Sequence, residues 1–205
     1  MPARTAAAYL CALVSFGCGI GLVTERGYKL AAYFFLAFLG LWMLAFRVPV
    51  IVKAPLDILS WENWGETAAI VAAACALSEK MGAARALYGV TMVVFGTAHF
   101  VYLKETASLV PGWLPWHLSW AAFTGAAYIA AGLGILSGIL ARWAVILSAA
   151  QMGGFTLLVW LPIITAAGPK TAFQWSETMI SLALTVSGWV IAESCRTSAG
   201  AVPRS

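Results

Sequence analysis

Residues 95–120 read FGTAHFVYLKETASLVPGWLPWHLSW, and the rest of the chain is organised around this stretch. An apolar run ends at His99, a short segment carries Pro111 and Pro115, and a second apolar run begins at His117. Proline is excluded from the interior of regular helices, and tryptophan gathers where a membrane protein meets the lipid–water interface. Because three tryptophans lie among the last eight residues, the stretch predicts a hairpin that joins two membrane helices at that interface.

The composition of the whole chain also indicates a membrane protein. Of its 205 residues, 62% are hydrophobic and 10% are charged, and the mean hydropathy is +0.88. A soluble domain carries about 25% charged residues, so this chain has too few polar side chains to cover a water-exposed surface. The net charge is +4, but the basic residues lie singly in short loops, which argues against nucleic-acid binding.

Apolar segments of roughly 17 to 25 residues are long enough to cross a bilayer as helices. The segments that meet this description here are Thr5–Thr24, Tyr28–Phe46, Asn63–Ser78, Ala86–Leu103, His117–Leu140, Trp143–Thr165 and Phe173–Ala192. We therefore expect an all-α integral membrane protein with about seven transmembrane helices.

The first three of these segments resemble the last three in sequence. The matching pieces are residues 7–9 with 126–128, 48–49 with 161–162, and 64–67 with 175–178. Copies that are offset by four helices cross the membrane in the same direction, which is a parallel repeat. We expect a partial repeat of three helices at residues 1–82 and a four-helix unit at residues 83–205. A helix before Thr5 would complete the first copy.

The distribution of Lys and Arg predicts the orientation in the membrane, because cytoplasmic loops carry more of them. One side holds Arg26, Lys29, Lys80, Arg85, Arg142, Arg196 and Arg204, and the other holds Arg4, Arg47, Lys53, Lys104 and Lys170. We expect the carboxyl end to lie in the cytoplasm. The amino end and the hairpin then lie outside.

Polar and aromatic residues near the hairpin are candidates for ligand binding. They are His99, Tyr102, Trp113, Trp116, His117 and Tyr128, with Trp120 as a further pocket wall. A histidine at this depth can bind a metal or a haem, or form a hydrogen bond with a quinone carbonyl. The alternative is an interfacial histidine that is bonded to a loop carbonyl. Haem is not expected, because bis-histidine haem sites lie deeper in the bundle, with small residues opposite the ring.

A second set of candidates, for proton or ion handling, comprises Arg47, Glu66 and Glu177. The two glutamates occupy equivalent places in the two copies of the repeat, so the fold can bring both to one pocket. The alternative for Glu66 is a capping box with Asn63 at the start of a helix. Arg47 would either pair with Glu66 or extend to the lipid headgroups.

Two features of the apolar segments predict close helix packing. Gln151 is followed by Gly153 and Gly154, which favours a hydrogen bond from its amide to a neighbouring helix. The glycines of one segment form a packing seam, at Gly125, Gly132, Gly134 and Gly138.

No sequence motif for a soluble enzyme activity is present. The chain has no Gly-rich phosphate loop, no H-E-x-x-H and no G-x-S-x-G. Its four cysteines form no C-x-x-C pair, and we expect them to be packing residues and no metal site to be built. Whether the chain catalyses a reaction of its own is left open by these residues.

Three motifs resemble the DoxX-like family of small bacterial membrane proteins. They are GTAHF at residues 96–100, LVPGWLP at 109–115 and TGAAYIAAGLG at 124–134, within a similarity over about residues 85–192. The resemblance implies a four-helix bundle in the bacterial inner membrane, with both ends of the unit cytoplasmic. It also implies association with respiratory or sulfur-linked redox complexes, since the related DoxD protein is a subunit of thiosulfate:quinone oxidoreductase.

Taken together, these features predict a membrane-integral subunit of a quinone-linked redox complex, with a quinone or small-molecule site at the outer face. One alternative is a non-enzymatic accessory subunit of a respiratory or photosynthetic assembly. A second alternative is a small-molecule carrier. The expected partners are the lipid bilayer and other membrane-protein subunits.

Overall fold

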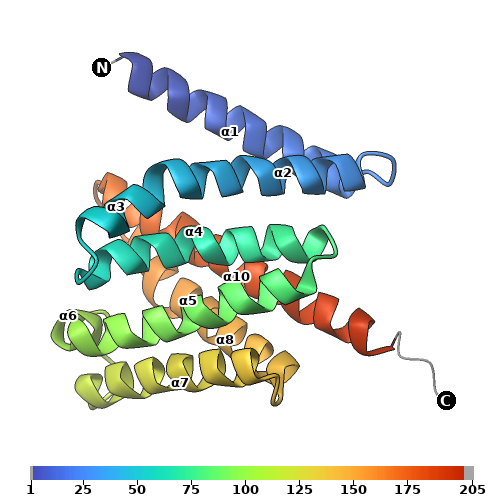
Figure 1. Ribbon diagram of the computed structural model, residues 1–205. Helices are drawn as coiled ribbons and strands as arrows, with labels where there is room; N and C mark the ends of the chain where they lie inside the picture. Colours follow the sequence, from blue (N-terminus) through green and yellow to red (C-terminus); the bar gives the residue numbers. More distant parts are fainter. Residues whose placement is uncertain (1, 201–205) are drawn as a thin grey trace.

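The fold is a bundle of long helices that run back and forth, shown by a computed structural model that describes residues 2–200 (Figure 1). Within this range the chain contains helices and no strand. The long helical rods are α1 (Pro2–Val23), α2–η1–α3 (Tyr28–Trp42, Met43–Arg47, Val48–Lys53), α4 (Ile58–Leu77), α5 (Met81–Val101), α7 (His117–Ser137), α8–η2–α9 (Ala141–Phe155, Thr156–Trp160, Leu161–Thr165) and α10 (Ala172–Gly200). A short helix, α6 (Leu103–Ser108), lies between α5 and α7.

Among the described residues, five rods are long and apolar enough to cross a membrane. They are Tyr28–Lys53, Met81–Val101, His117–Ser137, Ala141–Thr165 and Ala172–Arg196. The chain is therefore an all-α protein of the multi-pass membrane class. The expected number of seven transmembrane helices stays a prediction, because α1 offers only a shorter apolar segment, Ala8–Val23, and α4 begins with several polar residues.

The core of the bundle consists of α4, α5, α7, α8 and α10. Helix α4 packs against both α5 and α10, and its buried side chains from Ala68 to Ala76 are mostly alanines. Small side chains allow neighbouring helices to approach closely. The predicted boundary at residues 82/83 is not tested by this packing, and α4 contacts helices on both sides of it.

Helices α5 and α7 touch along their backbones. A Cβ atom on Gly96 would lie 2.5 Å from the carbonyl oxygen of Gly125, and one on Gly132 would lie 2.7 Å from that of Gly89. Side chains larger than hydrogen do not fit at such distances. The predicted glycine seam is therefore confirmed at Gly125 and Gly132, where α7 contacts α5.

Two rods continue through a proline because each contains a π-helical turn just before it. The second apolar segment was expected to end at Phe46, but the helix continues through Pro49 to Lys53. Proline lacks an N–H group and clashes with the preceding turn of an α-helix, and the wider π-turn relieves that clash. The rods also match in register, since α2 and α8 begin 113 residues apart, at 28 and 141, and so do η1 and η2, at 43 and 156.

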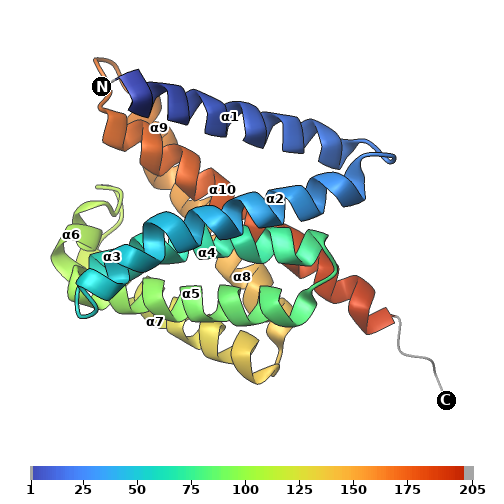
Figure 2. The same cartoon turned by 45° about the horizontal axis from the view of Figure 1, so that its top comes forward.

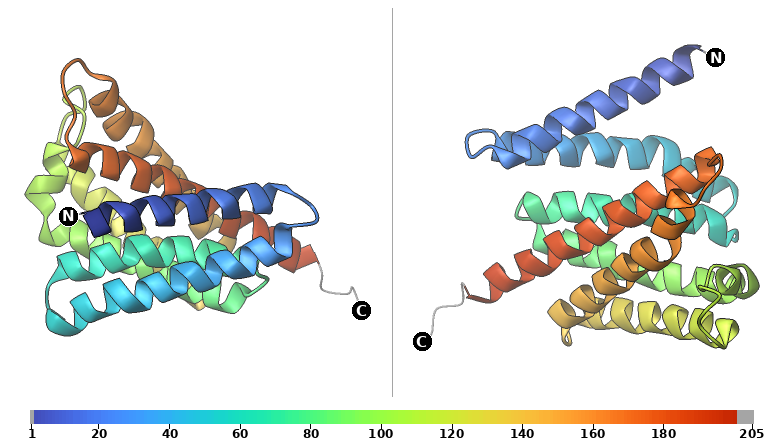
Figure 3. Two further views of the ribbon diagram at one scale, coloured as in Figure 1. Left: turned by 90° about the horizontal axis from the view of Figure 1, so that it is seen from above. Right: turned by 180° about the vertical axis from the view of Figure 1, so that it is seen from behind.

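The ends of the rods gather at two ends of the bundle (Figures 1 and 3). The hairpin end holds α6, the segment from α6 to α7, and the links from α3 to α4 and from α9 to α10. The turn end holds the links from α1 to α2, from α4 to α5 and from α7 to α8. Arg204, which entered the charge comparison, lies outside the described residues, and the orientation of the two ends in a membrane stays a prediction.

Helix α1 stands apart from the core. It packs against α2 near the turn end and diverges from it toward the amino end (Figures 1 and 2). Its side chains at Tyr9, Leu13 and Phe16 are exposed. This outer pair of helices is therefore a poor place for a site that needs converging side chains.

Candidate functional site

At the hairpin end, a cavity of about 630 Å³ lies between α4, α5, α7, the α8–η2 rod and α10. The segment from α6 to α7 lies along its edge, through Thr106, Leu109, Val110, Pro111, Trp113 and Leu114. Most of the remaining lining is aromatic or aliphatic, with a few polar groups. Cavities of this size and character are typical of small-molecule sites.

His99 lies in the last turn of α5, where three contacts fix its ring. Its Nδ1 atom lies 2.8 Å from the carbonyl oxygen of Phe95, one turn earlier on the same helix. The ring stacks on Phe155 of α8, with a centroid distance of 6.0 Å and an interplanar angle of 24°, and meets the edge of Tyr128 at 5.4 Å. The imidazole is therefore held in one orientation at the cavity wall.

Gly125 of α7 makes this arrangement of His99 possible. A Cβ atom on Gly125 would lie 2.8 Å from the Cβ of His99 and 3.2 Å from the carbonyl oxygen of Gly96. The absence of a side chain lets α7 lie directly against the backbone that carries the histidine. The glycine seam therefore positions a candidate ligand-binding residue in addition to packing two helices.

Gln151 and Tyr128 place amide and hydroxyl groups at the cavity. Gln151 Nε2 donates to the carbonyl oxygen of Thr124 at 3.0 Å, which confirms the predicted hydrogen bond between helices. The Tyr128 hydroxyl is fully buried and lacks a hydrogen bond of normal geometry, with Gln151 as its polar neighbour. A buried hydroxyl without a good partner favours a ligand that supplies one.

Three carboxyl groups also line the cavity. Glu62 and Glu66 come from successive turns of α4, and Glu177 comes from the first turns of α10. The two glutamates that occupy equivalent places in the sequence repeat therefore lie at one cavity. Arg47, the third candidate for proton or ion handling, does not line the cavity.

Of the two alternatives for Arg47, the ion pair with Glu66 is not the contact that the structure shows. Its Nε atom donates to the Thr67 hydroxyl oxygen at 3.0 Å. Within the described part of the chain no ion pair joins Arg47 to Glu66, although the two lie within electrostatic reach of each other. Arg47 is the last residue of the π-turn η1, and the residue that it contacts directly follows Glu66 on α4.

The expected capping box of Asn63 and Glu66 is wrong, because α4 begins five residues earlier. Its N-cap is Asp57, whose carboxylate accepts hydrogen bonds from the backbone N–H groups of Leu59 and Ser60. Asn63 lies inside the helix and donates to the carbonyl oxygen of Leu59 at 2.7 Å. The hydrogen bond from the Ser60 hydroxyl, aided by the two backbone bonds, lowers the pKa of Asp57.

The structure brings most, but not all, of the candidate residues together. The candidates at the cavity are His99, Tyr102, Trp113, Tyr128, Glu66 and Glu177, and Trp120 also lines it. Trp116 and His117 are not lining residues. Trp116 is the N-cap of α7 with a positive φ of 57°, and its side chain is 78% exposed, so it points away from the bundle.

Several lining residues were not anticipated from the sequence. Glu62 lies one turn before Glu66, and that i, i+4 spacing on one helix face was a usable signal. Phe155 directly precedes the π-turn η2 and Trp160 is its last residue. At the start of this turn, Thr156 and Ser181 join α8–η2 to α10 by a hydrogen bond of 2.7 Å. No sequence pattern marks a π-turn, so those walls were not predictable.

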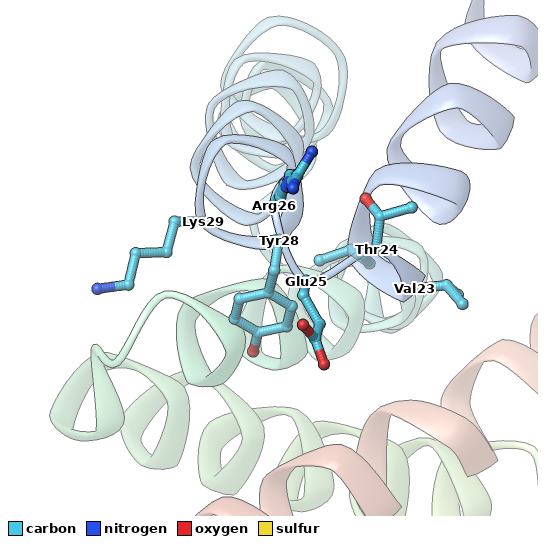
Figure 4. A pocket seen from close by; sticks show the side chains of 7 residues that line it. Val23, Thr24, Glu25, Arg26, Tyr28 and Lys29 are labelled. Carbon is cyan, nitrogen blue, oxygen red and sulfur yellow. The ribbon is translucent and has the colours of Figure 1, made fainter.

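A second pocket, of about 500 Å³, lies at the turn between α1 and α2 (Figure 4). The side chains of Arg26 and Lys29 point away from each other in this view, so the charged groups do not converge on a ligand. Tyr28 uses its hydroxyl to donate to the carbonyl oxygen of Leu77 at 3.2 Å, which attaches α2 to α4. This pocket therefore serves packing, and the cavity beside His99 is the candidate site.

Among residues 2–200, no group of three or more His, Cys, Asp or Glu side chains is arranged to hold a metal ion. The polar groups of the cavity are instead spread over aromatic walls, an arrangement that suits an organic molecule. Comparison with models of protein families, with curated proteins and with solved structures gives no match to this chain.

Proposed function

We propose that this protein is a membrane-integral subunit of a quinone-linked redox complex, and that a lipid-soluble quinone-type molecule binds in the cavity beside His99. The observation that carries the proposal is the cavity itself. It is of ligand size, its walls are largely aromatic and aliphatic, and one fixed imidazole lies among its polar groups. These are the features of sites for planar apolar molecules with polar substituents.

The geometry of the walls supports a flat ring as the ligand. Phe155 and Tyr128 present aromatic faces and edges next to His99, and aromatic rings pack against one another in these arrangements. Phe123 and Leu158 line the cavity and are 62% and 51% exposed. These apolar side chains suit the passage of a molecule with a hydrocarbon tail, which would enter the cavity from the lipid.

We further propose that the chain is related to the DoxX-like family and works with other membrane subunits in the bacterial inner membrane, with its carboxyl end in the cytoplasm. A quinone exchanges electrons with a second redox centre, and a partner subunit would supply it. Seven membrane crossings and a parallel repeat belong to the same proposal. The equal register of the π-turns before Pro49 and Pro162 supports the repeat.

A small-molecule carrier is the second candidate, and one specific observation favours it. Glu62, Glu66 and Glu177 all line the cavity, and carboxylates within a membrane bundle are typical of routes for cations or protons. Uptake of an organic cation into proteoliposomes, lost in Glu177→Gln, would favour this candidate. An accessory subunit without a ligand would show neither uptake nor bound quinone.

The proposed quinone site is tested by purifying the protein from native membranes and measuring bound quinone by solvent extraction and mass spectrometry. We expect about one quinone per chain in the unaltered protein and in His117→Phe, because His117 lies outside the cavity. We expect loss of the quinone in His99→Phe. A protein that carries no quinone, or equal loss in both variants, would rule out this site.

A further inference from the structure

The hydrogen bond of His99 determines which of its ring nitrogens carries the proton. A carbonyl oxygen has no hydrogen to donate, so Nδ1 must donate to the Phe95 oxygen at 2.8 Å. In a neutral imidazole, only one nitrogen carries a proton. Nε2 therefore has a lone pair and accepts hydrogen bonds.

Nε2 is also the ring atom that remains for a ligand. It makes no hydrogen bond with any residue in the described range, and His99 lines the cavity. A half-turn of the ring would exchange Nδ1 for a carbon atom and remove the bond to Phe95. The hydrogen bond to Phe95 therefore favours the orientation that is present, while Phe155 and Tyr128 hold the plane of the ring.

The neighbouring amide adds a second acceptor. Gln151 uses one N–H of its Nε2 group on the carbonyl of Thr124, so its Oε1 atom and its second N–H are left for other contacts. The Tyr128 hydroxyl has Gln151 as its polar neighbour and can donate or accept. Of these polar groups, Nε2 of His99 is therefore the one that can only accept a hydrogen bond.

We infer that this cavity selects the reduced, hydroxyl-bearing form of its ligand, a quinol, over the oxidised quinone. A quinol O–H group donates to Nε2 of His99, whereas a quinone carbonyl would set one lone pair against another. An unmet acceptor in a buried site weakens binding by roughly 10-fold or more. This inference rests on the proposed function, because it specifies the redox form that the same site binds.

The test measures binding of three matched compounds to the purified full-length protein in lipid nanodiscs by isothermal titration calorimetry under anaerobic conditions. The compounds are decyl-ubiquinol, decyl-ubiquinone and the dimethyl ether of decyl-ubiquinol, which keeps the shape but lacks the O–H groups. We expect the quinol to bind at least tenfold more tightly than the other two. His117→Phe should keep this preference, and His99→Phe should bind all three within about twofold of one another, because its ring offers no lone pair.

Each outcome has a distinct meaning. Quinone that binds as tightly as quinol would overturn the inference and leave the proposed site in place. Absence of binding by all three compounds, in a protein whose melting temperature is normal, would overturn both. A quinol preference that persists in His99→Phe would overturn the role given to His99, and a preference for the ether would do the same.

Discussion

The rods α2–η1–α3 and α8–η2–α9 share their local structure and differ in their surroundings. Each has a 15-residue α-helix, a five-residue π-turn and a proline in the following turn. In the first rod η1 has no buried residue, and in the second η2 buries Val159 and Trp160 beside the cavity. The same type of turn is therefore unburied in one rod and lines the wall of the candidate cavity in the other.

The difference shows that packing, and not local sequence, makes the site. Around η2, the neighbouring helices α7 and α10 supply Tyr128 and Ser181, and α5 supplies His99. Around η1, Met43 packs against the core and Arg47 donates a hydrogen bond to Thr67 of α4. Variants at matched positions of the two rods can separate these roles.

The largest loss of quinol affinity is expected from deleting Leu157, which lies in η2 and is 62% exposed. The deletion turns the π-turn into an α-turn and shifts one side of the rod by about 1.5 Å along the helix axis. Displacements of this size in a site can cost roughly 100-fold in affinity. We expect such a loss in quinol binding, measured by calorimetry in nanodiscs.

Deletion of Leu44 is the matched control, because it lies 113 residues earlier in η1 and has the same exposure. It should change the first rod and leave quinol affinity within about twofold. Equal losses of quinol affinity in both deletion variants would mean that the two rods do not differ in function. That result would contradict the assignment of the ligand site to the second rod alone.

A smaller but clear effect is expected from Gly125→Ala. The new methyl group would lie 2.8 Å from the Cβ of His99, so α5 and α7 must separate or the histidine must move. Overpacking of this kind destabilises a protein by about 1–3 kcal/mol. We expect a lower unfolding midpoint in detergent titrations together with weaker quinol binding.

Gly40→Ala is the contrasting variant, since a methyl group there meets no atom within 4 Å. Alanine in an open helical position stabilises the helix by about 0.5–1 kcal/mol relative to glycine. The unfolding midpoint should therefore stay or rise, with unchanged quinol binding. A fall as large as that of Gly125→Ala would refute the close contact at Gly125.

The smallest effect concerns the caps of α4 and α10. Asp57 caps α4, and Thr171 caps α10 through reciprocal bonds with Gln174. The pKa of Asp57 is lowered, first by the Ser60 hydroxyl. The Asp57 carboxylate therefore stabilises α4 fully above the pKa that it has in the unfolded chain, about 3.9. This stabilisation is lost as the pH falls through the lower pKa that Asp57 has in the folded protein.

Melting temperatures in detergent at neutral and acidic pH check this difference between the caps. Asp57→Ala should lower the melting temperature near pH 7 and have a smaller effect near pH 3. Thr171→Ala should lower it by the same amount at both values, because its cap is uncharged. A pH-independent effect of Asp57→Ala would show that the carboxylate does not stabilise α4.

The class of the fold was predictable from the sequence, because apolar runs of membrane length directly specify helices. The start of α4 was not, since the polar residues from Asp57 to Asn63 favour a loop and a cap, while tertiary packing extends the helix through them. The continuation of α2–η1–α3 past Pro49 was missed because a π-turn accommodates the proline. Local rules fail here where neighbouring helices or unusual turns decide the backbone.

The candidate site was predictable to the extent that aromatic and titratable residues at one end of the bundle must lie near one another. His99, Glu66 and Glu177 were anticipated and line the cavity. Trp116 was expected there as well, but its positive φ at the start of α7 turns the side chain outward, which spacing cannot reveal. The position of Phe155 in the cavity wall was not predictable, because it depends on which face of α8 packs toward α5.

The central claim, that the ligand site lies beside His99 and not at the outer helix pair, is tested most directly by photolabelling. A photoreactive quinone analogue would be applied to native membranes, and the labelled peptides would be identified by mass spectrometry. We predict label on Tyr128 of α7 and on Phe155 of α8, suppressed by excess decyl-ubiquinol. Label confined to α1 and α2, or label that decyl-ubiquinol does not suppress, would contradict the account.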